Sequence, residues 1–359
     1  MSLPRPRAPA FILGAITILA GYLAIVYELA LVVILFGFLV SLFTIALAVA
    51  LMGRATLAGR REHAAEVFAG DPVDVSLAIV NVGAVRSAFF LDVEDEIQTE
   101  AVPPRGLVVS LTPAEEAVLR YRVVFPRRGA ITPGKTAVAS RFPFGFFERR
   151  TTLDVESSIL VLPRPGKLRR DVLAETPVPQ AEVPVAVRGG LGEFHGVREY
   201  RSDDNPRWIH WKTSARRGGL HVREFEREID RRLIVALDPV GAKLEALDAA
   251  VSIAATLLDH YARAGYAVAL AVTGESPSWV SFGAGADHVR RALRPLALAM
   301  PARSGGSPAW RPGDVRGAHV VRVTAGAGDP AQVASIAAVA SSVRSIDAAE
   351  KPALVADAI

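Results

Sequence analysis

The feature that most constrains this chain is an apolar stretch near its start, residues 10–52, which contains a single charge, Glu28. One helix over this stretch would be about 65 Å long at ~1.5 Å per residue, whereas the hydrocarbon core of a bilayer is roughly 30 Å thick. The stretch therefore predicts two membrane passes. An aromatic residue and a charge suit the membrane interface, so we expect the break at Tyr27-Glu28, with helices near 10–26 and 29–52.

A secretory signal peptide is the alternative interpretation of such a stretch. The apolar core of a signal peptide has about 7–15 residues, and residues 10–52 are far longer. The residues that flank the hairpin are basic at both ends: Arg5, Arg7, Arg54, Arg60 and Arg61. Because cationic flanks stay in the cytoplasm, the sequence predicts an inner-membrane protein with both termini cytoplasmic and a basic arm over residues 1–9.

Residues 62–163 show the pattern of short β-strands. Valine, leucine and isoleucine alternate with other residues from 73 to 79, which predicts a half-buried strand. Further strand candidates are separated by proline, glycine and charged clusters, at 89–93, 106–111, 118–125 and 159–162. Short strands at this spacing suggest an immunoglobulin-like β-sandwich, a fold that serves for binding or simply as a spacer.

The rest of the chain divides into three parts. Residues 164–187 contain several prolines and predict an extended linker, and residues 188–232 form a polar, aromatic block. From 233 to 359 we expect strands at 233–237, 267–272 and 319–323, alternating with helices at 244–263, 287–299 and 330–343. This alternation predicts a parallel sheet with helices on both faces.

Composition excludes several classes of function. The chain has no cysteine, which removes disulfides, thiolate metal sites and thiol nucleophiles together. Its net charge of +4 is too small to indicate a nucleic-acid partner. The block at 188–232 holds 11 basic and 8 acidic residues, so it also lacks the one-sided excess of a nucleic-acid face.

Residues 129–136 read Gly-Ala-Ile-Thr-Pro-Gly-Lys-Thr and fit the phosphate-binding loop pattern letter for letter. Such a loop holds phosphates with backbone N–H groups, and Pro133 has none. Lys135 should also open a helix, yet the residues after it alternate like a strand. We interpret the match as accidental, and nucleotide binding through Lys135 remains the less favoured alternative.

Other motifs are weaker. The glycines near residues 190–196 resemble a dinucleotide-binding loop, but their spacing is off by one and no strand precedes them. The histidines show no H-E-x-x-H spacing, and the chain has no G-x-S-x-G nucleophile motif. These patterns indicate no metal centre and no serine hydrolase.

Residues 196–216 closely resemble the signature of the bacterial domain of unknown function 58 family, which reads roughly R-x-Y-x-x-G-D-x-x-R-x-I-x-W-x-x-[ST]-A-R. The matching residues are Tyr200, Asp204, Arg207, Ile209, Trp211, Ser214 and Arg216. The usual glycine before the aspartate is Asp203 here, so the turn is expected to differ. Residues 142–147, Phe-Pro-Phe-Gly-Phe-Phe, resemble the motif that closes the β domain of this family.

The resemblance implies a membrane protein with two N-terminal passes, a β domain and a von Willebrand A-like, Rossmann-type α/β domain. Genes of the family commonly neighbour those of MoxR-type AAA ATPases and transglutaminase-like membrane proteins, which implies such an ATPase and other membrane proteins of this neighbourhood as partners. A von Willebrand A metal site needs D-x-S-x-S after the first strand, and residues 238–242 read Asp-Pro-Val-Gly-Ala. Because Asp238 alone cannot hold a cation, we expect a degenerate site without metal.

The candidate interaction residues of the block are charged, aromatic or hydroxylic: Arg198, Tyr200, Asp203, Asp204, Arg207, Trp208, His210, Trp211, Ser214 and Arg216. The arginines are expected to bind the aspartates in bidentate pairs, and the aromatic rings to stack on guanidinium groups or to fill a junction between domains. The block either locks the linker onto the α/β sheet or binds a partner, and the sequence leaves both open.

From the residues and the resemblance together, we expect a membrane-anchored scaffold or adaptor without catalytic activity, cofactor or metal. The alternative is a hydrolase-like enzyme in which acid, base, nucleophile and anion holder are Asp204, His210, Ser214 and Arg216. An imidazole of His210 within hydrogen-bond reach of Ser214, in an open pocket, would favour that alternative. The oligomeric state is not predicted.

Overall fold

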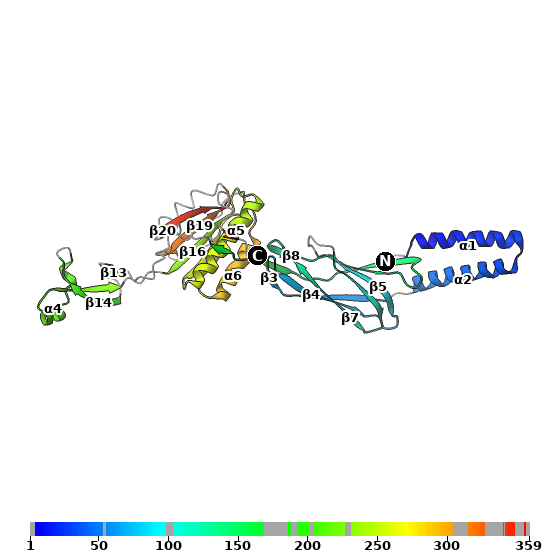
Figure 1. Ribbon diagram of the computed structural model, residues 1–359, viewed down its shortest axis with the longest axis horizontal. Coiled ribbons are helices and arrows are strands. Elements are labelled where there is room, and N and C mark those ends of the chain that lie inside the picture. Colours follow the sequence, from blue (N-terminus) through cyan, green and yellow to red (C-terminus); the bar gives the residue numbers. More distant parts are fainter. Residues whose placement is uncertain are drawn as a thin grey trace. The chain divides into compact units, whose positions relative to one another are not determined.

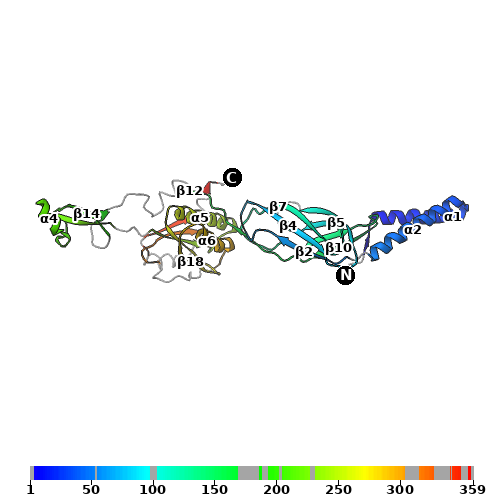
Figure 2. The same ribbon diagram turned by 90° about the horizontal axis from the view of Figure 1, so that it is seen from below.

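The computed structural model describes residues 4–52, 55–97, 103–168, 186–187, 193–201, 204–226, 231–303, 315–326, 340, 342–348 and 355–356. The chain divides into two compact units, Met1–Leu162 and Pro163–Ile359. The first unit contains a helical hairpin and a β-rich region, and the second contains a small three-stranded sheet and an α/β region (Figures 1 and 2).

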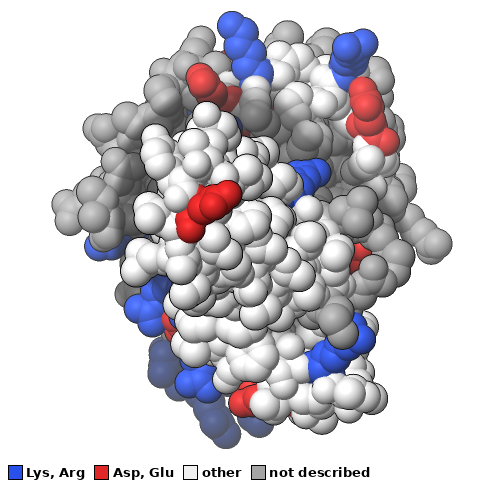
Figure 3. All heavy atoms as spheres, turned by 90° about the vertical axis from the view of Figure 1, so that its right-hand side faces the viewer, with Lys and Arg blue, Asp and Glu red and all other residues white. Residues whose placement is uncertain are grey.

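The apolar stretch forms two antiparallel helices, α1 (Ala8–Tyr27) and α2 (Ala30–Met52). The chain reverses at Glu28, whose backbone is left-handed with φ of 51°, so the break lies where the sequence predicts it. Gly21 lets the helices approach closely, because a Cβ atom there would lie 2.9 Å from the ring of Phe36. Both helices are long and apolar enough to cross a membrane, and Figure 3, seen from the hairpin tip, shows a largely uncharged surface.

The start of the chain differs from the expected basic arm. Arg5 and Pro6 form a short strand, β1 (Arg5–Pro6), which pairs antiparallel with β10 (Phe147–Leu153). Arg7 then donates its backbone N–H to Phe146 O at 2.9 Å, immediately before α1 begins. Residues 5–7 therefore belong to the β region.

The β region is built from three sheets. The first has the order β1, β10, β9 (Thr136–Ser140), β5 (Ala88–Asp95) and β6 (Arg105–Leu111). The second contains β2 (Leu57–Glu62), β4 (Pro72–Asn81) and β7 (Glu116–Val124). The third, smaller sheet contains β3 (Glu66–Phe68), β11 (Ile159–Leu162) and β8 (Gly129–Ile131).

One apolar cluster lies between the first two sheets, and another joins the second sheet to the third. Leu77 and Ile79 of β4 pack with Leu91 and Val93 of β5, which makes the region a two-layer sandwich. All five strand candidates of the sequence are present, but β2, β3, β8, β9 and β10 were not predicted, and β2 begins five residues before the expected boundary at 62. The unpredicted strands are short or rich in arginine and threonine, so apolar alternation does not mark them. The immunoglobulin-like topology stays a prediction.

A fully buried ion pair joins the two layers of the sandwich. Arg61 of β2 and Asp95 of β5 form a bidentate pair, in which Arg61 Nε donates to Asp95 Oδ2 at 3.0 Å and Nη2 donates to Oδ1. The side chains of both residues are at most 1% exposed. Arg61 therefore does not act as a basic residue at the membrane surface, in contrast to the sequence-based interpretation.

Every remaining polar group of this pair is satisfied by neighbours. Arg61 Nη1 donates to Val155 O at 3.1 Å and to Ser157 Oγ at 3.0 Å. Asp95 accepts from Thr136 Oγ1 at 2.8 Å and from the hydroxyl of Tyr121. Burial raises the pKa of the Tyr121 phenol, and its hydrogen bond to Asp95 raises it further. The phenol thus stays a donor to the carboxylate at ordinary pH.

The α/β region contains one five-stranded sheet. Its order is β18 (Ser278–Gly283), β17 (Ala267–Val272), β16 (Arg232–Asp238), β19 (His319–Thr324) and β20 (Ser342–Asp347). Neighbouring strands are parallel except for β18, which runs antiparallel to β17. The helices α5 (Leu244–Arg263) and α6 (Ala286–Leu298) pack on the sheet and on each other, and therefore cover the same face (Figure 1).

Two predictions for this unit need correction and also fall partly outside the described residues. The expected helix at 330–343 ends in β20, because Ser342 and Val343 are paired with β19, and residues 330–339 are not among those described. The expected linker at 164–187 contains ordered pairs at both ends. Lys167–Leu168 forms β12 with β21 (Val355–Ala356), and Ala186–Val187 forms β13.

We predict that Arg61→Ala lowers the free energy of unfolding of the sandwich by about 3–5 kcal/mol, because it leaves the Asp95 carboxylate buried without its cation. Arg61→Met combined with Asp95→Leu should recover most of the loss, since both charges are then removed. Hydrogen exchange of the amides of β4 and β5 in the full chain measures this free energy for the sandwich alone.

The matched control for this experiment is Arg122→Ala. Arg122 Nε donates to Asp74 Oδ1 at 2.7 Å, but both side chains are well exposed, at 65% and 78%. Water replaces such a partner, so exchange should change little. Equal effects of the Arg61 and Arg122 substitutions would contradict a dominant role of the buried pair.

Candidate interaction site in the charged and aromatic block

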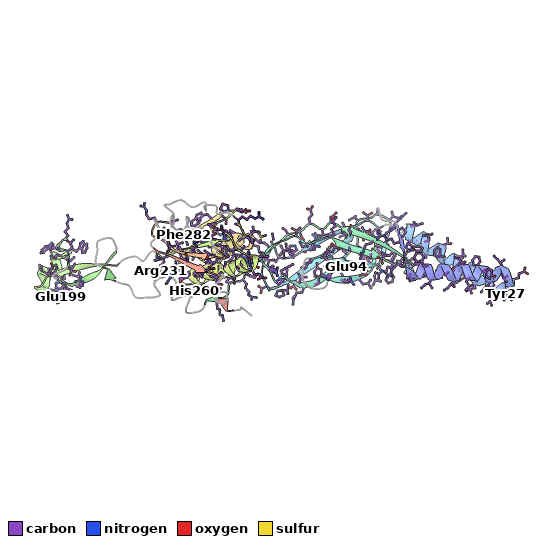
Figure 4. The ribbon with its side chains drawn as sticks, turned by 90° about the horizontal axis from the view of Figure 1, so that it is seen from above. Tyr27, Glu94, Glu199, Arg231, His260 and Phe282 are labelled. Carbon is purple, nitrogen blue, oxygen red and sulfur yellow. The ribbon has the colours of Figure 1, made fainter. Side chains whose placement is uncertain are left out.

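A small antiparallel sheet forms the frame of the block. β15 (His221–Glu226) lies between β13 and β14 (Glu193–Glu199). The chain between β14 and β15 contains a 3₁₀ turn, η1 (Pro206–Trp208), and a short helix, α4 (Trp211–Arg217). Figure 4 labels Glu199 at the end of β14, where this connecting segment begins. Ile209 makes an isolated bridge to Val222 of β15, which fixes the segment to the sheet.

Asp204, the aspartate of the signature block, forms an ion pair with Arg198. Arg198 Nη1 and Nη2 donate to Asp204 Oδ2 and Oδ1 at 2.7 and 2.6 Å, a bidentate pair in which the Asp204 side chain is 3% exposed. The backbone N–H of Arg201 donates to the same carboxylate at 2.8 Å. Arg198 thus binds an aspartate in a bidentate pair, as the sequence predicts, and Asp204 also closes the turn after β14.

His210 and Ser214 organise the start of α4. His210 is the N-cap residue, and its Nδ1 accepts the backbone N–H of Thr213 at 3.1 Å. Ser214 Oγ donates to the backbone carbonyl of His210 at 3.1 Å and accepts the backbone N–H of His221 at 2.9 Å. Ser214 thus ties α4 to β15, and its hydrogen bonds to described residues go to backbone groups rather than to the imidazole of His210.

Two members of the candidate catalytic set are engaged in structural contacts. Asp204 pairs with Arg198, and Ser214 is 9% exposed and bonded to the backbone. The observation that would have favoured an enzyme, an imidazole of His210 bonded to Ser214, is therefore not found. Arg216 lies exposed on the last turn of α4.

The outward surface of the block is aromatic and cationic. The indole of Trp211 is at the first position of α4 and is 68% exposed. Exposed basic side chains lie on the same short segment, at Arg207, Lys212, Arg216 and Arg217. Leu220, after α4, is 47% exposed. Arg207 and Arg216 form no ion pair with a carboxylate in the described part of the chain, in contrast to the expectation for them.

Other predicted members of the block have modest roles or cannot be placed. Tyr200 continues the sheet through its backbone, donating to Leu220 O at 2.8 Å, and Trp208 is half-buried in η1. Asp203 lies outside the described residues. No described contact shows Tyr200, Trp208 or Trp211 stacked on a guanidinium group.

The residue expected to mark a degenerate metal site is held by an arginine. Asp238, 1% exposed at the end of β16, accepts a hydrogen bond from Arg322 Nη2 of the neighbouring strand β19. Its Oδ1 accepts the backbone N–H of Val240 at 3.0 Å. Among the described residues no cluster of histidine, aspartate and glutamate has the geometry of a metal site. The guanidinium supplies the positive charge that the buried carboxylate requires.

The phosphate-loop lookalike lies in the β-sandwich, between two strands. Gly129–Ile131 is β8, and Thr136, which follows Lys135, begins β9 rather than a helix. Gly134 donates to Glu96 O, and Lys135 Nζ lies 3.1 Å from Asp154 Oδ1. A Cβ at Gly134 would lie 2.7 Å from the same carbonyl. The loop is thus closed by protein contacts.

Sequence reasoning missed the structural roles of Arg61 and Arg322. Arg322 could have been found, because it is the single charge within the apolar strand that neighbours the strand of Asp238. Arg61 carries no such local signal, since its partner Asp95 is distant in the sequence.

The chain is thus a multi-domain protein with two apolar N-terminal helices, a β-rich region and a later α/β region. The family model described as "Protein of unknown function DUF58" matches residues 196–321, from β14 to β19. The protein is 32% identical to the "Uncharacterized protein YeaD" of Bacillus subtilis (strain 168) over 103 residues, and these residues are 29% of this chain. The chain spans about a quarter of the length of that relative, 25%.

Comparison with solved structures gives weak likenesses. The CARDB domain of a Pyrococcus furiosus protein is 15% identical, covering 29% of this chain and 97% of that domain with a TM-score of 0.21. A β-glucosidase from Listeria innocua is 13% identical, covering 30% of this chain and 17% of the enzyme with a TM-score of 0.17. Neither likeness carries an argument about function.

We predict that Asp204→Ala makes the segment 207–217 much more susceptible to limited trypsin digestion. The substitution leaves Arg198 without its carboxylate and the N–H of Arg201 without its acceptor, so the segment opens more often. Arg207, Lys212, Arg216 and Arg217 provide cleavage sites within it. Mass spectrometry of the fragments locates the cuts.

Arg291→Ala, on the exposed side of α6, is the control and should leave the digestion pattern of the block unchanged. A variant Asp204→Ala that is cut no faster than the wild type would contradict the assigned role of Asp204.

Proposed function

We propose that this protein is a membrane-anchored scaffold or adaptor that presents the block around α4 to a partner protein. The observation that carries the proposal is the indole of Trp211, which is 68% exposed on a helix held in place by the contacts of Ser214 and His210. Exposed tryptophan and arginine are typical of residues that dominate protein interfaces. A rigid frame with an exposed aromatic side chain suits recognition better than catalysis.

The membrane anchor is the hairpin of α1 and α2. The helices have 20 and 23 residues, which at ~1.5 Å per residue gives about 30 and 35 Å, close to the thickness of a hydrocarbon core. Large apolar side chains point outward along both, including Ile18 at 75% and Leu31 at 78% exposure. Such a surface requires an apolar environment, and the bilayer is the one we propose.

We propose that both ends of the hairpin lie on the cytoplasmic side of the inner membrane. Arg5, Arg7 and Arg60 are exposed at the ends of the hairpin, and the turn carries Glu28 instead. Arg61 no longer counts toward this asymmetry because it is buried, and Arg54 lies outside the described residues. The remaining cations still favour the cytoplasm.

The partner we propose is a MoxR-type AAA ATPase, on the family resemblance alone. A partner that binds the block should have an acidic surface with an apolar pocket for Trp211. The acidic surface would complement the exposed cations of the block, Arg207, Lys212, Arg216 and Arg217. The α/β region is proposed to be von Willebrand A-like, with Arg322 in place of a metal ion beside Asp238. The alternatives, an enzyme or a nucleotide-binding protein, gain no support from the contacts of Ser214 or Lys135.

We predict that a MoxR-type AAA ATPase is recovered with the wild-type protein from native membranes solubilised in detergent, and is lost with Trp211→Ala and with Arg216→Ala. Both substitutions remove exposed side chains and leave the frame of the block intact. Loss of the ATPase would therefore report on recognition by these side chains. Mass spectrometry of the affinity-purified complexes provides the measurement.

The matched controls are Met300→Ala and Arg291→Ala, which remove exposed side chains elsewhere, the former 70% exposed. They should retain the partner. Equal recovery with all variants would return the block to a purely structural role, and recovery of no ATPase with the wild type would contradict the proposed partner.

We also predict that green fluorescent protein fused to the C-terminus is fluorescent, whereas alkaline phosphatase fused there is inactive, because this end remains in the cytoplasm. Fusions truncated after Glu28 should give the opposite pair of results. A C-terminal phosphatase with full activity would overturn the orientation.

A further inference from the structure

The hairpin is joined to the β-sandwich with almost no intervening chain. β1 ends at Pro6 and α1 begins at Ala8, while α2 ends at Met52 and β2 begins at Leu57. β1 pairs with β10, so the base of α1 is hydrogen-bonded to the sandwich. Figure 4 labels Tyr27 at the far tip of the hairpin and Glu94 within the sandwich. The end of the sandwich nearest the hairpin therefore lies at a depth set by the helices.

The last turns of α2 run beside the sandwich. Phe43, nine residues before the end of α2, packs edge-to-face on Phe147 of β10, with ring centroids 5.7 Å apart. Further along α2, Val49 and Ala50 line a cavity of about 150 Å³ together with Leu57 and other sandwich residues. Only the part of α2 from Ala30 to about Phe43 extends beyond Phe147, which is roughly 21 Å at ~1.5 Å per residue.

The length of the protruding part of the hairpin determines how close the sandwich lies to the membrane. A hydrocarbon core is roughly 30 Å thick and each headgroup layer adds several ångströms. A hairpin that protrudes by 21 to 30 Å can bring the turn at Tyr27-Glu28 to the far interface only if the sandwich touches the near headgroup layer. The surface at this end should then suit an interface, where aromatic rings and cations are favoured.

The side chains at this end have that character. Phe89, Phe90 and Phe144 are 38%, 47% and 48% exposed, and Phe142 packs between the first two, with ring centroids 4.9 and 6.0 Å away. Val85, in the loop between β4 and β5, is 84% exposed. That loop lies at the same end, because Val82 donates to the carbonyl of Thr56, just after α2.

One of these rings lies on strained backbone. Phe90 has φ of 47°, a left-handed conformation that is unusual for an aromatic residue. Neither Phe90 nor Val109, which faces it on β6, is paired, and the register of β5 and β6 is the same on both sides of this gap. The strain persists at a residue that is 47% exposed, which favours a functional reason for this conformation.

Cations surround these apolar side chains. Exposed guanidinium groups occur at Arg5, Arg7, Arg86 and Arg141. Glu148 pairs with Arg7 at 3.5 Å and with Arg141 at 3.0 Å, and Asp92 lies 3.5 Å from Arg141, so part of this charge is balanced. The combination of exposed phenylalanine and arginine matches a layer of lipid phosphates above acyl chains.

We propose that this end of the sandwich, the aromatic end formed by Val82, Val85, Phe89, Phe90, Phe142 and Phe144, is a second membrane-contacting surface that inserts into the headgroup layer of the leaflet entered by the hairpin. The proposal rests on the proposed membrane anchorage of the hairpin. It makes the sandwich a membrane-seated domain held at a fixed depth and orientation.

The absence of cysteine makes the test direct. Phe144→Cys in the full chain is labelled with an environment-sensitive nitrobenzoxadiazole probe and reconstituted in phosphatidylcholine–phosphatidylglycerol vesicles. The vesicles contain no spin label, lipids spin-labelled at the headgroup, or lipids spin-labelled deep in the acyl chains. Val124→Cys is the matched control, because Val124 is 44% exposed and lies at the opposite end of the sandwich, paired with Pro72. Ile34→Cys, 72% exposed on α2, reports insertion of the hairpin itself.

We expect the probe at Phe144 to be quenched several-fold more strongly than the probe at Val124, and the probe at Ile34 to be quenched by spin labels deep in the acyl chains. Strong quenching at Ile34 with equal, weak quenching at Phe144 and Val124 would overturn the proposal and leave the anchor intact. Failure of quenching at Ile34 would overturn the membrane anchor, and the aromatic end with it. Val85→Cys repeats the measurement in a second loop, should Phe144→Cys disturb the ring cluster.

Discussion

The buried pair of Arg61 and Asp95 is the interaction on which the first unit depends. It joins β2 of one sheet to β5 of the other, and Tyr121 and Thr136 add hydrogen bonds from β7 and β9. Two charges in an apolar core are tolerated only when the protein satisfies their remaining hydrogen bonds, and here the surrounding groups do so. Because Arg61 follows the end of α2 by only nine residues, the same pair fixes the chain where it leaves the hairpin.

Periodicity alone located much of the secondary structure. α5 and β17 have the predicted bounds, since a long amphipathic pattern and a short apolar run are local signals. β18, β10 and β1 were missed because they owe their conformation to pairing with a neighbour that local sequence does not reveal. The same limit explains Arg61. Its position after an apolar helix indicates a membrane flank, whereas its burial depends on Asp95, 34 residues away.

The candidate sites show the same division between what is local and what is tertiary. The capping role of His210 and the pairing of Arg198 with Asp204 arise within a few residues, and only the second was predicted. The loss of both hydroxyls after Asp238 was visible in the sequence, but its guanidinium partner comes from another strand. In each case a polar residue that looked chemically reactive forms a structural contact.

The short connections between hairpin and sandwich have a mechanical consequence. A domain joined to its anchor by a flexible linker samples all orientations above the membrane, and a partner must capture it from that ensemble at an entropic cost. Here β1 pairs with β10 and Phe43 packs on Phe147, so the sandwich cannot rotate independently of the helices. If the hairpin spans the membrane as we propose, it determines the depth and direction of the sandwich as well as its location.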